Sequence, residues 1–110
     1  MLEGVYKVRF QVNDAVGRSV MYAHAGKMLG GNSAFAHYGT CTSANGRWRG
    51  EILNREHTPA RNENPPFGGH EVGIGFSGTC DGEGALLEAT VLAGKRSLRL
   101  TAVLKLMRRA

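Results

Sequence analysis

The sequence predicts an all-β fold, an eight-stranded antiparallel up-and-down barrel that occupies residues 1–110 as a single domain. Three observations predict it. Apolar residues recur at every second position in about eight segments, which is the pattern of half-buried strands. Turn signals separate these segments at hairpin spacing. The 16 glycines are spread between and within the segments, as expected for many turns and bent strands.

The first segment illustrates the pattern. Tyr6, Val8 and Phe10 share one face, and Lys7 and Arg9 share the other, so the first face is expected to point into the barrel. No segment has a helical period of about 3.6 residues. Strands are therefore expected at residues 5–12, 16–22, 27–29, 35–42, 48–55, 72–77, 87–91 and 98–106.

Two alternatives accompany this prediction. The segment 98–106 could form a short helix, although its leucines fit a period of two better. Two stacked sheets are the alternative to a barrel. The barrel is favoured because successive hairpins need no crossover connection and because closure leaves no exposed strand edge.

Turn residues mark the connections. Asn45-Gly46 is the strongest hairpin signal in the chain, and Asp81-Gly82 is a second. Residues 57–70 hold all three prolines and are expected to form one long loop, a feature that often has a functional role.

Composition narrows the class of protein. The net charge of +5 is compatible with an acidic partner. Cys41 and Cys80 are expected to be small buried side chains rather than a disulfide. No apolar stretch is long enough for a membrane helix and no signal peptide is recognisable, so we expect a cytoplasmic protein with no membrane role.

No group of residues predicts catalysis. Cys41 and Ser77 lack the surroundings of a catalytic nucleophile, and the glycine-rich segment 78–84 lacks the lysine of a phosphate loop. The four histidines lie far apart and form no metal-binding pair. We therefore expect a protein that is not an enzyme and has no cofactor and no metal site.

Basic residues give a candidate protein-binding surface. In a closed barrel the last strand pairs with the first, which would place Lys7 and Arg9 on the outside beside Arg99 and Lys105. This basic stripe is either a solvated face that prevents aggregation or a docking surface for an acidic partner. Nucleic acid is a less favoured partner because no basic and aromatic RNA-binding motif is present.

Aromatic residues give a second candidate site. Tyr22, Tyr38 and Trp48 are expected to line the interior of the barrel, where an eight-stranded fold either fills with side chains or holds one small ligand. A small-ligand-binding barrel of the lipocalin or avidin type is accordingly the alternative function.

Short motifs extend over nearly the whole chain and together resemble the GrlR family of type III secretion regulators. A Gly-x-Tyr strand, a glycine turn, a Gly-Gly pair and a Tyr-Gly strand occur in the family's order, followed by a strand and a hairpin turn. The matching residues are Gly4-Val5-Tyr6, Phe10, Gly26, Gly30-Gly31, Tyr38-Gly39, Ile74–Thr79 and Asp81-Gly82.

This resemblance implies a lipocalin-like barrel that forms a homodimer. It also implies a cytoplasmic negative regulator that sequesters a helix-turn-helix transcriptional activator. The stretch that matches the family's acidic activator-binding loop is 43–46, and it holds no acidic residue in this chain.

Overall fold

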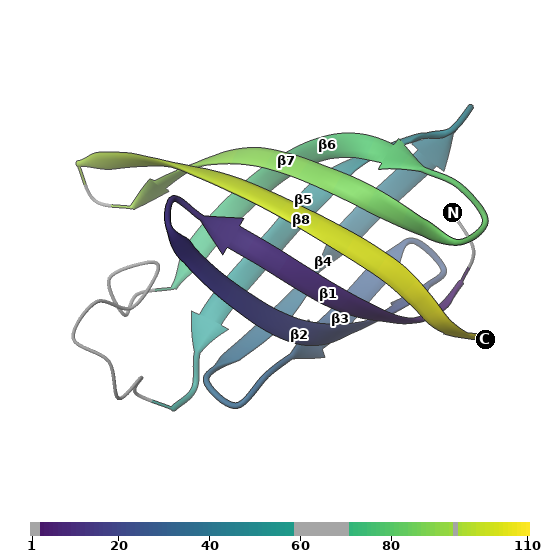
Figure 1. The fold of residues 1–110 in the computed structure, drawn as a ribbon, viewed down its shortest axis with the longest axis horizontal. Helices are drawn as coiled ribbons and strands as arrows, with labels where there is room; N and C mark the ends of the chain where they lie inside the picture. Colours follow the sequence, from purple (N-terminus) through teal and green to yellow (C-terminus); the bar gives the residue numbers. More distant parts are fainter. Residues whose placement is uncertain (1–2, 59–70, 94) are drawn as a thin grey trace.

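The computed structural model describes residues 3–58, 71–93 and 95–110. All regular structure in these ranges is β, with eight antiparallel strands that form one closed barrel in chain order (Figure 1). The fold class predicted from the sequence is confirmed. The strands are β1 (Gly4–Val12), β2 (Ala15–His24), β3 (Lys27–Gly31), β4 (Phe35–Ala44), β5 (Arg47–Glu56), β6 (Val72–Cys80), β7 (Gly84–Ala93) and β8 (Arg96–Arg109).

The barrel closes where β8 pairs with β1. The register runs from Gly4 opposite Arg109 to Val12 opposite Leu100, with one shift between Val5 and Tyr6. The last segment is therefore a strand, as predicted, and both the helix and the two-sheet alternatives are wrong. Each strand therefore has a partner on both sides, although residues 15–19 of β2 are not paired with β3, and residues 72–75 of β6 and 90–93 of β7 are not paired with each other.

Two-residue turns connect β4 to β5 at Asn45-Gly46, as predicted, and β2 to β3 at Ala25-Gly26. Asn45 and Gly46 both have a positive φ, and so do Ala25 and Gly26, which is the conformation that matches the twist of a hairpin. Of the loop predicted at residues 57–70, residues 59–70 lie outside the described part of the chain.

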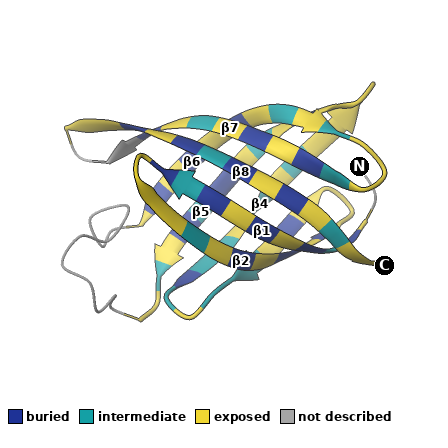
Figure 2. Cartoon of the chain, viewed as in Figure 1, coloured by how far each residue is buried: buried dark blue, intermediate teal, exposed yellow. Residues whose placement is uncertain are grey.

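The core lies inside the barrel and contains the alternate residues of the strands. Figure 2 shows bands of buried and exposed residues that alternate along the strands. Tyr6, Val8, Phe10 and Val12 point inward, as the sequence predicts. The two cysteines are free, and both pack against the core while remaining partly exposed.

Trp48 is the largest side chain of the core, and a glycine makes room for it. Its indole N–H reaches past Gly78 on β6 and donates to the backbone carbonyl of Leu86 on β7, at 2.8 Å. A Cβ on Gly78 would lie 1.8 Å from that carbonyl oxygen and 3.1 Å from the indole nitrogen. The indole ring also packs on Phe76, with 4.5 Å between ring centroids. The missing side chain at Gly78 thus permits a link across three strands.

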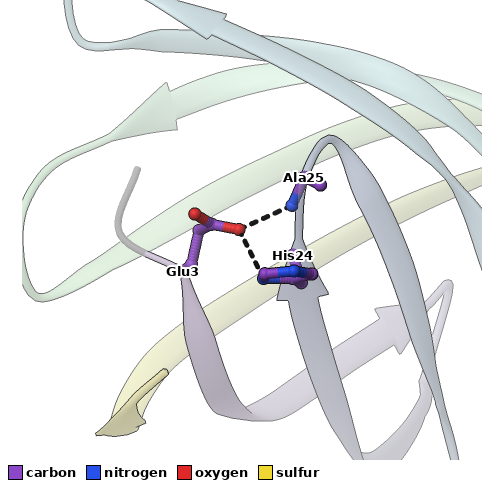
Figure 3. A network of polar contacts seen from close by, with 3 residues as sticks. All are labelled: Glu3, His24 and Ala25. Atoms are coloured by element: carbon purple, nitrogen blue, oxygen red, sulfur yellow. Dashed lines mark hydrogen bonds and ion pairs between the residues drawn. The ribbon is translucent and has the colours of Figure 1, made fainter.

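The two ends of the described chain meet at one end of the barrel. The backbone N–H of Ala110 donates to the carbonyl of Glu3. The carboxylate of Glu3 lies 2.7 Å from His24 Nδ1 and accepts a 2.6 Å hydrogen bond from the N–H of Ala25 (Figure 3). These contacts fasten the start of β1 to the turn between β2 and β3.

We expect the substitution Gly78→Ala to lower the free energy of unfolding by about 2 kcal/mol or more, because the new Cβ overlaps the Leu86 carbonyl. Denaturant unfolding measures the loss. The matched control is Gly75→Ala on the outer face of the same strand, where a Cβ meets nothing within 4 Å, and a change within about 0.5 kcal/mol is expected. Equal destabilisation by the two substitutions would contradict this packing.

Candidate functional site

Four cations gather on the outer face of β1, β2 and β8. Lys7 lies directly opposite Lys105, and two residues further along β1, Arg9 lies directly opposite Arg18. All four are exposed, and within the described ranges no acidic side chain forms an ion pair with any of them. We call Lys7, Arg9, Arg18 and Lys105 the basic patch.

Arg18 was not among the residues predicted for this surface, although a signal for it exists. The two-residue turn Asn13-Asp14 places Val12 opposite Ala15, and counting back along both strands then places Arg9 opposite Arg18. A prediction based only on the pairing of the first and last strands could not find it.

Arg99 lies on the outer face of β8, as predicted, but its predicted position beside Lys7 and Arg9 is wrong. The β1–β8 pairing ends at Leu100, so Arg99 lies beyond the last residue of β1 and its guanidinium is 3.9 Å from the carboxylate of Glu88. Both residues line a shallow groove of about 910 Å³ on the outer face, together with Arg49 and Glu51. The mixture of cations and carboxylates makes this groove different in character from the basic patch.

Exposed apolar side chains lie among the cations. Val20 lies opposite Lys7 on β2, and Val103 on β8 lies between Arg9 and Leu86. All three apolar side chains are exposed. The surface therefore offers both positive charge and apolar area to a partner.

A second outer surface is a row of apolar residues across four strands. Tyr22, Leu29, Tyr38 and Leu53 are direct cross-strand neighbours on β2, β3, β4 and β5. Leu29 is 58% exposed, and Leu53 is half-buried. We call these four residues the apolar belt.

The expected interior position of Tyr22 and Tyr38 is therefore wrong, since they are 39% and 38% exposed on the outside. On β2 the inward positions belong to Met21 and Ala23, and alternation then forces Tyr22 outward. Trp48 does lie inside, as predicted. Its indole N–H is bonded to Leu86 and its ring packs on Phe76, so it is part of the core.

The interior contains a polar cluster that the sequence prediction did not identify. Asn54 is 2% exposed, and its Oδ1 lies 2.5 Å from Nδ1 of His37 on the neighbouring strand. Ser19 is 8% exposed, and it lines a small interior cavity together with His37 and Asn54. The sequence does contain a signal for this cluster, which is Asn54 itself. Asn54 stands at an inward position of β5, where the alternation of Trp48 and Ile52 predicts an apolar residue.

The environment of His37 affects its charge. Burial lowers the pKa of His37 below the ordinary value, and the hydrogen bond with Asn54 opposes part of that change. Its ring also meets the ring of Phe10 edge-on, with 6.3 Å between centroids. The neutral imidazole is thus the form that the barrel interior favours.

The described residues contain no group of three or more His, Cys, Asp or Glu side chains that could hold a metal ion. Nor do they contain a helix long and apolar enough to span a membrane. No family model matches the chain, and no curated protein matches it. The GrlR resemblance remains a prediction from short motifs.

Protonation of His37 should destabilise the barrel. Its pKa is lower in the folded state than the value of about 6.5 in the unfolded chain, so the unfolded chain binds the proton more readily. The contribution of His37 to stability is full above about pH 6.5 and is lost as the pH falls through the lower folded value.

Denaturant unfolding of the native chain and of His37→Gln between about pH 7.5 and about pH 5 tests this expectation. The variant should lose less stability over that interval, because its amide does not titrate. Identical pH profiles for the two proteins would show that His37 makes no such contribution.

Proposed function

We propose that this protein is a non-enzymatic regulatory protein that acts by binding an acidic segment of a partner protein on the basic patch. The observation that supports the proposal best is the cross-strand placement of cations, Lys7 opposite Lys105 and Arg9 opposite Arg18. Like charges directly opposite one another destabilise a sheet. A partner that supplies carboxylates would relieve this repulsion.

The neighbouring apolar side chains favour a protein over a nucleic acid. Val20, Val103 and Leu86 are exposed among the cations and would contact apolar side chains of the partner. Proteins that bind single-stranded nucleic acid stack bases on aromatic side chains, and no aromatic residue lies directly opposite any of the four cations in the described strand pairs. An acidic segment with interspersed apolar residues matches both features of this surface.

The GrlR resemblance points to the nature of the partner. In that family it is a helix-turn-helix transcriptional activator, sequestered in the cytoplasm by a negative regulator of type III secretion. We propose a partner of the same class for this chain. Because the stretch 43–46 lacks the family's acidic residues, we assign the contact to the basic patch instead.

Charge reversal tests the assignment. The triple variant Lys7→Glu, Arg9→Glu, Lys105→Glu should lose the partner in affinity purification from the source cell's extract, with mass spectrometry as the readout. Arg99→Glu is the matched control, since it reverses an exposed arginine on the same strand as Lys105 but outside the patch, and it should retain the partner.

For a partner identified in this way, the triple substitution should weaken the dissociation constant at least about tenfold, and added salt should weaken binding to the native chain. Equal recovery by the native chain and the triple variant would contradict the proposal. Recovery of nucleic acid alone would replace it with a nucleic-acid function.

We further propose that two copies of the chain associate through the apolar belt. Monomeric proteins rarely expose a large contiguous apolar patch, and tyrosine is enriched at protein interfaces. Tyr22, Leu29 and Tyr38 form such a patch on three adjacent strands. The same surface on a second copy provides a complementary apolar face.

Sedimentation equilibrium tests this association. The native chain should be a dimer, and the double variant Leu29→Glu, Tyr38→Glu should be a monomer, because each interface would then contain four buried carboxylates. Thr40→Glu is the control, at the next outward position of the same strand and outside the belt. A native monomer, or a double variant that still dimerises, would contradict the role of the belt.

A further inference from the structure

Three buried side-chain atoms of the described residues lack hydrogen-bond partners, and two of them line one cavity, which Glu56 Oε2, the third, does not. The side-chain Nδ2 of Asn54 and the hydroxyl Oγ of Ser19 are both buried, and neither bonds to any group in the part of the chain that the structure describes. Both residues are more than nine-tenths buried, at 2% and 8% exposure. Buried amides and hydroxyls in folded proteins are nearly always paired, so each exception needs an explanation.

The two groups line the same cavity. It has a volume of about 50 Å³, and apart from Ser19, His37 and Asn54 its walls are apolar. The apolar residues come from six strands and are Val8, Phe10, Met21, Ile52, Ile74, Leu87, Leu100, Ala102 and Leu104. Apolar walls with a few convergent polar groups are the usual lining of a small-molecule site, although pockets for drug-sized ligands are larger, at ~300–1,000 Å³.

His37 fixes the orientation of the Asn54 amide. Oδ1 of Asn54 faces Nδ1 of His37 at 2.5 Å, and because an amide oxygen only accepts, this contact is a hydrogen bond in the neutral tautomer that carries its proton on Nδ1. The amide oxygen is thereby occupied, and the two N–H groups on Nδ2 remain available as donors. The hydroxyl of Ser19 adds one more donor.

The charge of the cavity indicates what kind of molecule fits. No lysine or arginine is among its lining residues, and its only titratable lining group is His37, whose neutral form is favoured. An anionic head group would be buried without a counter-charge, which is strongly unfavourable. A neutral oxygen that accepts hydrogen bonds meets no such cost.

We propose that Asn54 and Ser19 form the polar end of an interior site for a small neutral molecule with a carbonyl or hydroxyl oxygen on a short apolar body. The cavity is about a third of the ~150 Å³ engineered cavity that holds benzene, so the ligand has about two or three non-hydrogen atoms. The flexible side chain of Met21 in the wall can adjust to it. The site goes beyond partner binding, because the basic patch lies on the outside of the barrel.

Ethanol is a suitable probe, with formate and propane as an anion and a hydrocarbon of similar size. Nuclear magnetic resonance titration follows the side-chain amide of Asn54 and the methyl groups of Leu100. Ethanol should shift both and saturate at neutral pH. Formate should not bind, and propane should bind at least about tenfold more weakly than ethanol, because it leaves the donors unpaired.

Three variants complete the test. Ser19→Ala removes one donor with little change in volume, and Asn54→Leu removes the amide. Each should weaken ethanol binding, by about tenfold for Asn54→Leu, and Asn54→Leu should bind propane as well as ethanol. Ser77→Ala is the control, an exposed hydroxyl on the outer face of β6, and should bind ethanol like the native chain.

Several results would overturn the site. These are ethanol binding that is unchanged in Ser19→Ala and Asn54→Leu, equal binding of ethanol and formate, or a crystal structure grown with ethanol that shows only ordered water on Asn54 Nδ2 and Ser19 Oγ. The triple charge-reversal variant of the basic patch should bind ethanol normally. Failure of the interior site is therefore distinguishable from failure of partner binding.

Discussion

Backbone pairing between β8 and β1 closes the sheet, and the rest of the structure depends on it. Once the sheet is a closed ring, each residue of a strand points either into the core or into solvent, and neighbours along the strand alternate. Tyr6 and Leu106 meet inside the barrel, and Lys7 and Lys105 meet outside. The same register that builds the core therefore also builds the basic patch.

The interior is filled unevenly. Trp48 passes the side-chain-free Gly78 to reach the backbone of β7, and the ring of Phe10 covers Gly17 on the neighbouring strand, so glycines provide room for the large rings. Asn54 and Ser19, in contrast, present hydrogen-bond donors to a small apolar cavity. A polar residue at an inward position costs stability unless it is paired, which is why the proposed interior site rests on these two residues.

The outer face divides into surfaces of different chemistry. β1 and β8 present cations with apolar neighbours, β2 to β5 present the row from Tyr22 to Leu53, and the groove around Arg99 mixes both signs of charge. The apolar belt and the basic patch adjoin on β2, where the outward residue next to Tyr22 is Val20, opposite Lys7. The proposed dimer and the proposed partner would therefore occupy neighbouring surfaces of the barrel, and the dimer contact does not include the four cations.

Strand positions and the closed barrel were predictable from the sequence, because alternation in β1, β6 and β8 is regular and Asn45-Gly46 sets a hairpin. Tyr22 and Tyr38 were misplaced because aromatic character was given more weight than alternation, and β2 and β4 carry apolar residues on both faces. Arg99 was placed too close to Lys7 and Arg9 because the sequence does not give the register between β1 and β8. In the structure this register pairs Val12, the last residue of β1, with Leu100, so Arg99 has no partner on β1. The pairing of His37 with Asn54 depends on the β4–β5 register, which their distance along the chain does not reveal.

The closure of the barrel can be measured directly in solution. Nuclear Overhauser contacts between backbone protons of Val8 and Leu104, and of Phe10 and Ala102, report the β1–β8 pairing. The structure predicts these cross-strand contacts, together with slow hydrogen exchange of the amides bonded between the two strands. Helical contacts within residues 98–107, or fast exchange along β1 and β8 with no contact between them, would contradict the closed barrel and with it the basic patch.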